Sequence, residues 1–256
     1  MPEVSTVSGI APSLCRVNLS AIRTDLAPDG VLHASINLGN PVLAQGDSVS
    51  PSGVTVDLAR QIAGRLDVPV EFVCFDAARK SFEALVTGAA TLGFMAIEPA
   101  RADQVGFTKP YALIEGVYVV PTESALRTVA DVDAPGVRIG VKEGSAYDLF
   151  LTRTLEHAEL VRGAEGVDVY LEQSLEAGAG IRQPATTFVD THDGQRLIDE
   201  AFMQIRQAVA VPRTASAETL TWVTEVVEEL KADGFVAQSL ERSGQGGVRV
   251  APAAQK

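Results

Sequence analysis

The stretch Leu92-Gly-Phe-Met-Ala-Ile-Glu-Pro-Ala-Arg101 decides the fold, because an apolar run ends there beside a cation. The run from Thr91 to Ile97 is typical of a buried strand. It must end at Glu98-Pro99, since proline lacks a backbone N–H and disfavours α geometry in the preceding residue. Arg101 follows, and its guanidinium can hold a carboxylate through two parallel hydrogen bonds. The spacing leaves two interpretations open, a ligand-binding arginine or an ordinary surface ion pair.

Regular patterns on both sides of this stretch predict an α/β fold. Strands are expected at 31–37, 68–75 and 91–97, with helices near 58–66 and 79–87 between them. This alternation is typical of a largely parallel sheet. Ligands of such sheets bind beyond the carboxyl ends of the strands, which here are Asn37–Asn40, Phe75–Ala77 and Phe94–Arg101. In the second helix we expect Phe82, Leu85 and Val86 to face inward.

The second half of the chain continues the alternation. Strands are expected at 114–120, 137–141, 159–162, 177–181 and 202–211, and helices after Ser145, over 165–175, after Ser216 and over 235–243. Ser145 and Asp148 have the spacing of a capping box, so the helix start presents backbone N–H groups that favour an anion. An ordinary capped helix without a ligand explains the same spacing. The glycines of 177–181 precede neither a third glycine nor a helix signature, so no dinucleotide loop is predicted.

Composition narrows the possible functions. The chain has 256 residues, 46% hydrophobic, and a net charge of −12 spread along its length, which argues against a nucleic-acid partner. No apolar run reaches the ~18 residues needed to cross a bilayer. Cys15 and Cys74 are not expected to form a disulfide. Neither a Cys/His cluster nor an acidic loop with calcium spacing occurs, so we predict no metal and no cofactor.

The N-terminal region predicts little regular structure. Residues 1–29 are expected to form an arm with one short helix near 21–26. The first residues lack the basic region and apolar core of a secretory signal. The sequence as written therefore predicts either a cytoplasmic protein or one whose leader is not included.

Three motifs occur in order along the chain: Gly53-Val-Thr-Val-Asp-Leu-Ala59, then Ile97-Glu-Pro-Ala-Arg101 with Val105-Gly-Phe-Thr-Lys-Pro-Tyr111, then Ile139-Gly-Val-Lys-Glu-Gly-Ser145. They resemble Gly-Phe-Asp-Val-Asp-Leu-Ala, Ile-Thr-Pro-Glu-Arg with Val-Asp-Phe-Ser-x-Pro-Tyr, and Val-Gly-Val-x-x-Gly-Thr. These patterns belong to the extracellular solute-binding proteins of amino-acid-type ABC importers, known as family 3. The resemblance covers roughly residues 30–243.

The resemblance implies a type II periplasmic-binding-protein fold, in which two α/β lobes are joined by two hinge strands. The hinges would lie near 111–115 and 206–210. After the arm at 1–29, lobe 1 would comprise 30–111 plus 211–256, and lobe 2 would comprise 112–210. The resemblance further implies a monomeric, non-catalytic protein at the cell surface or in the periplasm, which passes a small carboxylate to the membrane permease of an ABC importer.

The family pattern also suggests where the ligand binds. Arg101 matches the arginine that holds the ligand α-carboxylate, and Ser145 with Ala146 matches the helix start that holds the same group. The strand-end residues Asn37 and Asn40 are further candidates.

Departures from the pattern concern the ligand amine. Phe94, Ala96 and Ile181 stand where the family places groups that hold a protonated amine, and Asn40 stands where an aromatic covers the ligand. We therefore expect a carboxylate that need not carry an α-amino group. Phe94 and Leu43 would form an apolar wall for it. A second anionic or polar group of the ligand would be served by Lys142 or Arg182, with Gln183 beside the latter.

Two alternatives remain open at this point. The first is a dehydratase-like enzyme on the same scaffold that acts on a small cyclic carboxylate. It would use Glu98, Glu115 or Glu143 as an acid whose pKa is raised in an apolar cleft, although solvated surface glutamates explain the same residues. The second is an intracellular ligand-sensing module, which the missing signal favours.

Overall fold

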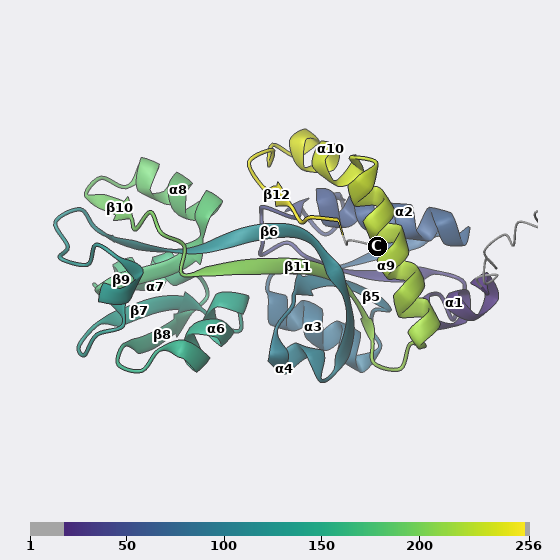
Figure 1. The fold of residues 1–256 in the computed structure, drawn as a ribbon, viewed down its shortest axis with the longest axis horizontal. Helices are drawn as coiled ribbons and strands as arrows, with labels where there is room; N and C mark the ends of the chain where they lie inside the picture. Colours follow the sequence, from purple (N-terminus) through teal and green to yellow (C-terminus); the bar gives the residue numbers. More distant parts are fainter. Residues whose placement is uncertain (1–17, 254–256) are drawn as a thin grey trace, which may run out of the picture.

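Two long neighbouring strands join the two halves of the molecule. The computed structural model describes residues 18–253, so most of the expected arm and Cys15 lie outside the described residues. In Figure 1, β6 (Val105–Pro121) and β11 (Met203–Pro212) run side by side between two groups of strands and helices. The main sheet has the order β4-β1-β5-β11-β6-β9-β7-β8. Each group is therefore a lobe built on its own side of the shared strands.

The first lobe contains the parallel strands predicted around Arg101. β1 pairs in parallel with β4 and with β5, while β11 returns antiparallel to β5. The elements of this lobe are α1 (Leu19–Leu26), β1 (Leu32–Asn37), β2 (Gln45–Gly46), β3 (Pro51–Ser52), α2 (Val54–Leu66), β4 (Val70–Phe75), α3 (Ala78–Thr87), β5 (Leu92–Ala96), α4 (Pro99–Ala102), α9 (Ala217–Ala232), α10 (Phe235–Arg242) and β12 (Arg249–Val250). The predicted strand–helix alternation is confirmed here.

The second lobe is smaller and repeats the parallel arrangement. β7 pairs in parallel with both β8 and β9, and β9 pairs antiparallel with β6. Its elements are α5 (Val129–Val132), β7 (Arg138–Lys142), α6 (Ala146–Thr154), β8 (Glu159–Gly163), α7 (Gly166–Glu172), β9 (Ala177–Ile181), α8 (Arg182–Thr191) and β10 (Gln195–Leu197). The carboxyl end of β7 and the start of α6 contact the first lobe, because Lys142 donates to the Gly39 carbonyl oxygen and the Gly144 carbonyl oxygen accepts from Arg101.

Two expectations about helices are wrong. Helix α8 directly follows β9, where no helix was predicted. Pro184 stands in its first turn, where proline costs no helical hydrogen bond, so this residue is compatible with the helix. In α3 Leu85 is buried and Phe82 packs against the core, as expected, but Val86 lies one residue beyond the buried face with 43% of its surface exposed.

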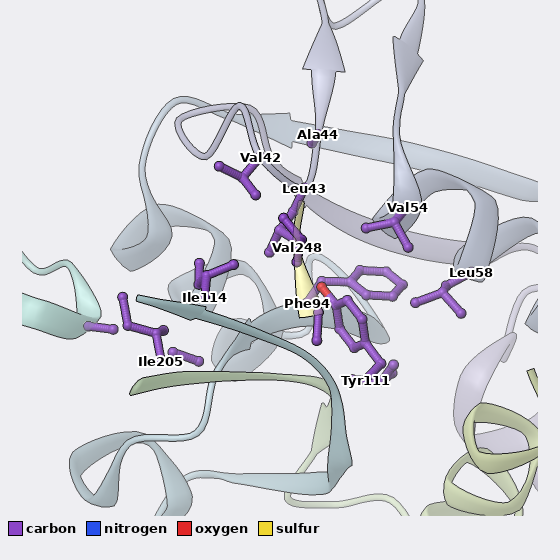
Figure 2. Packing of buried hydrophobic residues seen from close by; sticks show 14 of the residues in the cluster. Val42, Leu43, Ala44, Val54, Leu58, Phe94, Tyr111, Ile114, Ile205 and Val248 are labelled. Carbon is purple, nitrogen blue, oxygen red and sulfur yellow. The ribbon is translucent and has the colours of Figure 1, made fainter. Parts of the chain in front are cut away.

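The hydrophobic core continues from the first lobe onto the joining strands. Figure 2 shows Phe94 packed beside Tyr111, with Ile114 and Ile205 further along β6 and β11. The Phe94 and Tyr111 rings meet edge to face, with centroids 6.4 Å apart, which is a favoured aromatic geometry. Phe94 is therefore held by the core, and the strand end that follows it has a fixed position.

The β6–β11 ladder is irregular where the chain passes between the lobes. The pairing register shifts on both sides of Ala208, between Gln207 and Ala210. There the Val209 N–H donates to the hydroxyl of Thr108 at 3.1 Å. Such bulges bend a strand and increase its twist. This irregularity overlaps the segment 206–210 that was predicted as a hinge.

Close packing of α7 on the sheet gives a testable prediction. A Cβ at Gly140 in β7 would lie 2.4 Å from the Gly166 carbonyl oxygen, so Gly140→Ala forces the helix off the strand. We expect a loss of about 1–3 kcal/mol in unfolding free energy, measured by urea denaturation. Gly64→Ala is the matched control. No atom lies within 4 Å of its Cβ, so we expect a gain of about 0.5–1 kcal/mol. Changes of the same sign at both sites would contradict this packing.

Candidate functional site

A cavity of about 310 Å³ lies between the two lobes. The residues that line it come from strand ends, helix starts and joining strands of both lobes. Eight of the predicted site residues are among them: Asn37, Asn40, Phe94, Ala96, Arg101, Lys142, Ser145 and Ala146. Arg182 and Gln183 are not. The carboxyl ends of the strands therefore meet at this cavity, as the parallel arrangement requires.

Arg101 is a buried cation that forms no salt bridge within the described residues. Pro99 begins the short helix α4 after β5, and this turn places Arg101 at the cavity with 3% of its surface exposed. Its guanidinium donates to the carbonyl oxygens of Ala96 (3.4 Å) and Gly144 (3.0 Å). No carboxylate among residues 18–253 forms a salt bridge with it. Burial lowers the pKa of Arg101 to about 10, opposed by the charge of Glu98, so it stays protonated at neutral pH.

The start of α6 adds hydrogen-bond donors from the other lobe. Ser145 is the N-cap, and its hydroxyl accepts from the Asp148 N–H at 3.0 Å. The backbone N–H groups of Ala146 and Tyr147 find no acceptor within the described chain. Because Gly144 also accepts from Arg101, the guanidinium and this helix start lie together across the lobe boundary. An anion bound here would contact both lobes at once.

Asp148 holds the turn before α6 in place. The predicted capping box forms only in part, because the Asp148 carboxylate accepts from Gly144 N–H (2.9 Å) instead of Ser145 N–H. Asp148 also pairs with Arg162 of β8 at 3.0 Å. The Gly144 peptide is therefore fixed on both sides, with its N–H bound to Asp148 and its carbonyl bound to Arg101. The sequence spacing identified Ser145 and Asp148 as a helix start, but it did not predict the ion pair between Asp148 and Arg162.

Lys142 contacts the opposite lobe, but its charge is already compensated. Its ammonium donates to the Gly39 carbonyl oxygen at 3.2 Å and forms an ion pair with Glu165. Glu165 also lines the cavity. Lys142 therefore joins the lobes. Because Glu165 compensates its charge, Lys142 is less available to a second anionic group of the ligand than the sequence suggested.

Each of the two strand-end asparagines uses its side-chain oxygen in a hydrogen bond to the nearby backbone. The Asn37 side-chain oxygen accepts from Gly39 N–H at 3.1 Å, and the Asn40 side-chain oxygen accepts from Val42 N–H at 3.3 Å. Their NH₂ groups donate to no residue in the range 18–253. Gln207 of β11 also lines the cavity and is buried, which the sequence did not indicate.

Arg182 and Gln183 lie in the first turn of α8. The Arg182 guanidinium pairs with Glu115 of β6 and donates to the Asp199 carbonyl oxygen at 2.7 Å. The Gln183 side-chain oxygen is buried without a partner among the described residues. The helix that directly follows β9 thus directs Arg182 onto a joining strand and leaves Pro184 and Ala185 beside the cavity.

The remaining lining of the cavity is largely apolar. Both members of the predicted wall, Leu43 and Phe94, belong to it, as does Ile181. The other apolar lining side chains come from both lobes: Pro41, Ala78, Met95, Tyr147, Val167, Ala179, Pro184, Ala185 and Ile205. A bound solute would therefore meet donors near Arg101 and hydrocarbon around the rest of its surface.

The three glutamates considered as catalytic acids differ in environment. Glu98 is buried but pairs with Arg153 of α6 at 2.6 Å, and Glu115 pairs with Arg182. Glu143 lines the cavity and is exposed to solvent. None of the three is thus both buried and unpaired.

Over residues 18–253 no cluster of three or more His, Cys, Asp or Glu could hold a metal ion. No helix in the same range is long and apolar enough to span a membrane.

Comparison with known proteins identifies the family. The model of the bacterial extracellular solute-binding proteins, family 3, matches residues 37–245. The chain therefore belongs to the bacterial extracellular solute-binding proteins, family 3, as its motifs predicted. The comparison with curated proteins gave no match.

Solved structures agree with this assignment. A mutant of ArgBP from T. maritima is 24% identical, with 88% of this chain and 99% of that chain covered and a TM-score of 0.71. An amino acid ABC transporter substrate-binding protein from Streptococcus pneumoniae, bound to L-arginine, is 17% identical, with 90% and 99% covered and a TM-score of 0.72. The ancestral amino acid-binding protein AncCDT-1, a precursor of cyclohexadienyl dehydratase, is 21% identical, with 88% and 97% covered and a TM-score of 0.71. These similarities confirm the type II periplasmic-binding-protein fold.

The Arg153–Glu98 pair between the lobes gives a second prediction. Arg153→Met leaves the Glu98 carboxylate buried without its partner in the closed arrangement, at a cost of about 1–3 kcal/mol that lobe opening relieves. The open form should gain roughly 5- to 150-fold in relative population. Small-angle X-ray scattering of the ligand-free variant should show a larger radius of gyration. Arg213→Met, at an exposed position, serves as the control. An unchanged radius in the Arg153 variant would rule out this contact as a closing contact.

Proposed function

We propose that this protein captures a small carboxylate solute between its two lobes and delivers it to the membrane permease of an ABC importer. The observation that carries the proposal is the buried Arg101 guanidinium, which has no ionic partner in the described chain and lies beside the start of α6. A buried charge is unfavourable unless it is paired, so a cavity lined by such a cation is suited to an anion. A planar carboxylate matches the fork of N–H donors.

Closure of the lobes follows from the same arrangement. We assign α1 and residues 30–111 plus 211–253 to lobe 1 and residues 112–210 to lobe 2, with the hinges in β6 and β11. One carboxylate could then bridge Arg101 of lobe 1 and the α6 start of lobe 2. Because both contacts exist together only in the closed form, the ligand has a higher affinity for that form and shifts the population toward it. A permease can distinguish the closed form from the open one.

One related protein supports a role in the transport of an amino acid. The S. pneumoniae relative is described as an amino acid ABC transporter substrate-binding protein bound to L-arginine. We extend its transport role, and a location at the cell surface or in the periplasm, to this chain as a monomer. Enzyme activity is less well supported, because the acid that a dehydratase needs would have to be buried at the cavity and free to exchange a proton. Glu98, the buried one of the three candidates, is bound to Arg153.

Loss of Arg101 tests the proposal. The protein is unfolded and refolded to remove bound solute, then screened by thermal shift against L-amino acids and their amine-free carboxylate counterparts. A hundredfold excess over the dissociation constant stabilises the folded state by about 2.7 kcal/mol. Arg101→Ala should weaken binding of every responding carboxylate by about 2–5 kcal/mol, because its charge-assisted hydrogen bonds are lost. Arg101→Lys should recover part of this, since a lysine keeps the charge but not the fork.

Arg213→Ala is the matched control, since this exposed arginine lies away from the cavity. It should bind every responding carboxylate as the parent protein does. A panel without any responding carboxylate, or an Arg101→Ala variant with unchanged affinity, would overturn the proposal.

A further inference from the structure

We infer that the natural ligand is a carboxylate with an apolar body and no ammonium group, an inference that rests on the proposed function. The charged side chains that line the cavity are Arg101, Lys142, Glu143 and Glu165. Lys142 and Glu165 compensate each other, and Glu143 is exposed to solvent. Within residues 18–253 Arg101 is thus the buried charge of the cavity that forms no salt bridge, and it is positive. One ligand carboxylate balances it.

The hydrogen-bonding groups of the cavity also favour an anionic ligand over a cationic one. Oxygen atoms around it already accept bonds from the protein: Ala96 and Gly144 carbonyls from Arg101, the Gly39 carbonyl from Lys142, and the Asn37 and Asn40 side chains from backbone N–H groups. Donors remain available on Arg101, on the two asparagine NH₂ groups and at the start of α6. Gln207 offers one donor and one acceptor site without charge. The free donors are therefore concentrated at Arg101 and at the start of α6, whereas the carboxylates that line the cavity, Glu143 and Glu165, are exposed to solvent, and Glu165 is paired with Lys142.

An ammonium group is badly matched to such a lining. It carries only donors, and burial is unfavourable unless acceptors or a negative charge replace the lost water. The wall of the cavity is apolar at Phe94, Ala96 and Ile181, so these side chains offer an ammonium group neither a negative charge nor an acceptor. A ligand that carries only a carboxylate avoids this cost. Removal of the amine should therefore increase affinity.

The cavity also limits the size and polarity of the ligand. Its volume of about 310 Å³ lies at the lower end of the range for ligand pockets, about 300–1,000 Å³. The apolar walls of both lobes favour a hydrocarbon body over a second charged group. Branched aliphatic or arylalkyl monocarboxylates of roughly six to nine carbon atoms have this shape.

The experiment compares pairs of compounds that differ only in the amine. Isothermal titration of refolded protein uses L-leucine against 4-methylpentanoate and L-phenylalanine against 3-phenylpropanoate. We expect the amine-free member of at least one pair to bind tenfold or more tightly than its amino acid. Tighter binding of the amino acid in both pairs, lost in Arg101→Ala, would overturn this inference and leave the proposed function standing. If no carboxylate binds in these pairs or in the wider thermal-shift panel, both fail.

A variant of the cavity wall provides an independent readout. Ile181→Asp places a carboxylate at the cavity, whereas Ile181→Asn places an uncharged side chain of the same shape. We expect the ratio of amine-free to amino-acid affinity to fall at least tenfold in Ile181→Asp and to change less in Ile181→Asn. Equal ratios in the two variants would contradict the claim that missing negative charge sets the preference. Before the titrations, thermal unfolding of Ile181→Asp and Ile181→Asn is measured to show that both variants are folded.

Discussion

The buried guanidinium of Arg101 is the constraint on which the site depends. Transfer of a charge from water into a protein interior is unfavourable, and no carboxylate of residues 18–253 forms a salt bridge with Arg101, although the charge of Glu98 opposes the effect of burial on its pKa. The protein compensates only in part, with carbonyl oxygens of Ala96 in one lobe and Gly144 in the other. At the lobe boundary the guanidinium therefore has carbonyl acceptors from the protein on one side and faces the cavity, where an anion can bind, on the other.

Much of the surrounding structure keeps this arrangement fixed. Pro99 ends the strand so that Arg101 follows a tight turn, and Phe94 anchors the strand in the core through Tyr111. On the other lobe, Asp148 fixes the Gly144 peptide, and Arg162 fixes Asp148. Rigid donors on both sides reduce the ordering cost of ligand binding, so more of the contact free energy appears as affinity.

The sequence predicted those parts of the site that are set by local geometry. A strand end is defined by Pro99 and its spacing to Arg101, and a helix start is defined by Ser145 with Asp148. Both could be recognised from local sequence, without knowledge of contacts to distant segments. Arg182 could not be placed, because its direction depends on helix α8 and on an ion pair with Glu115 of a distant strand. Gln207 and the Glu98–Arg153 pair likewise depend on contacts between segments far apart in the chain.

The paired strands that join the lobes limit how the molecule can move. β6 and β11 are hydrogen-bonded to each other along most of their shared length, with the register shift near Ala208 as the irregular point. A two-stranded ribbon bends across its flat face far more readily than it shears within its plane, because shear breaks ladder hydrogen bonds. The proposed closure would therefore follow this bending. It would bring Arg101 and the α6 start back to the same mutual position, so the shape of the binding cavity would be reproduced from one capture to the next.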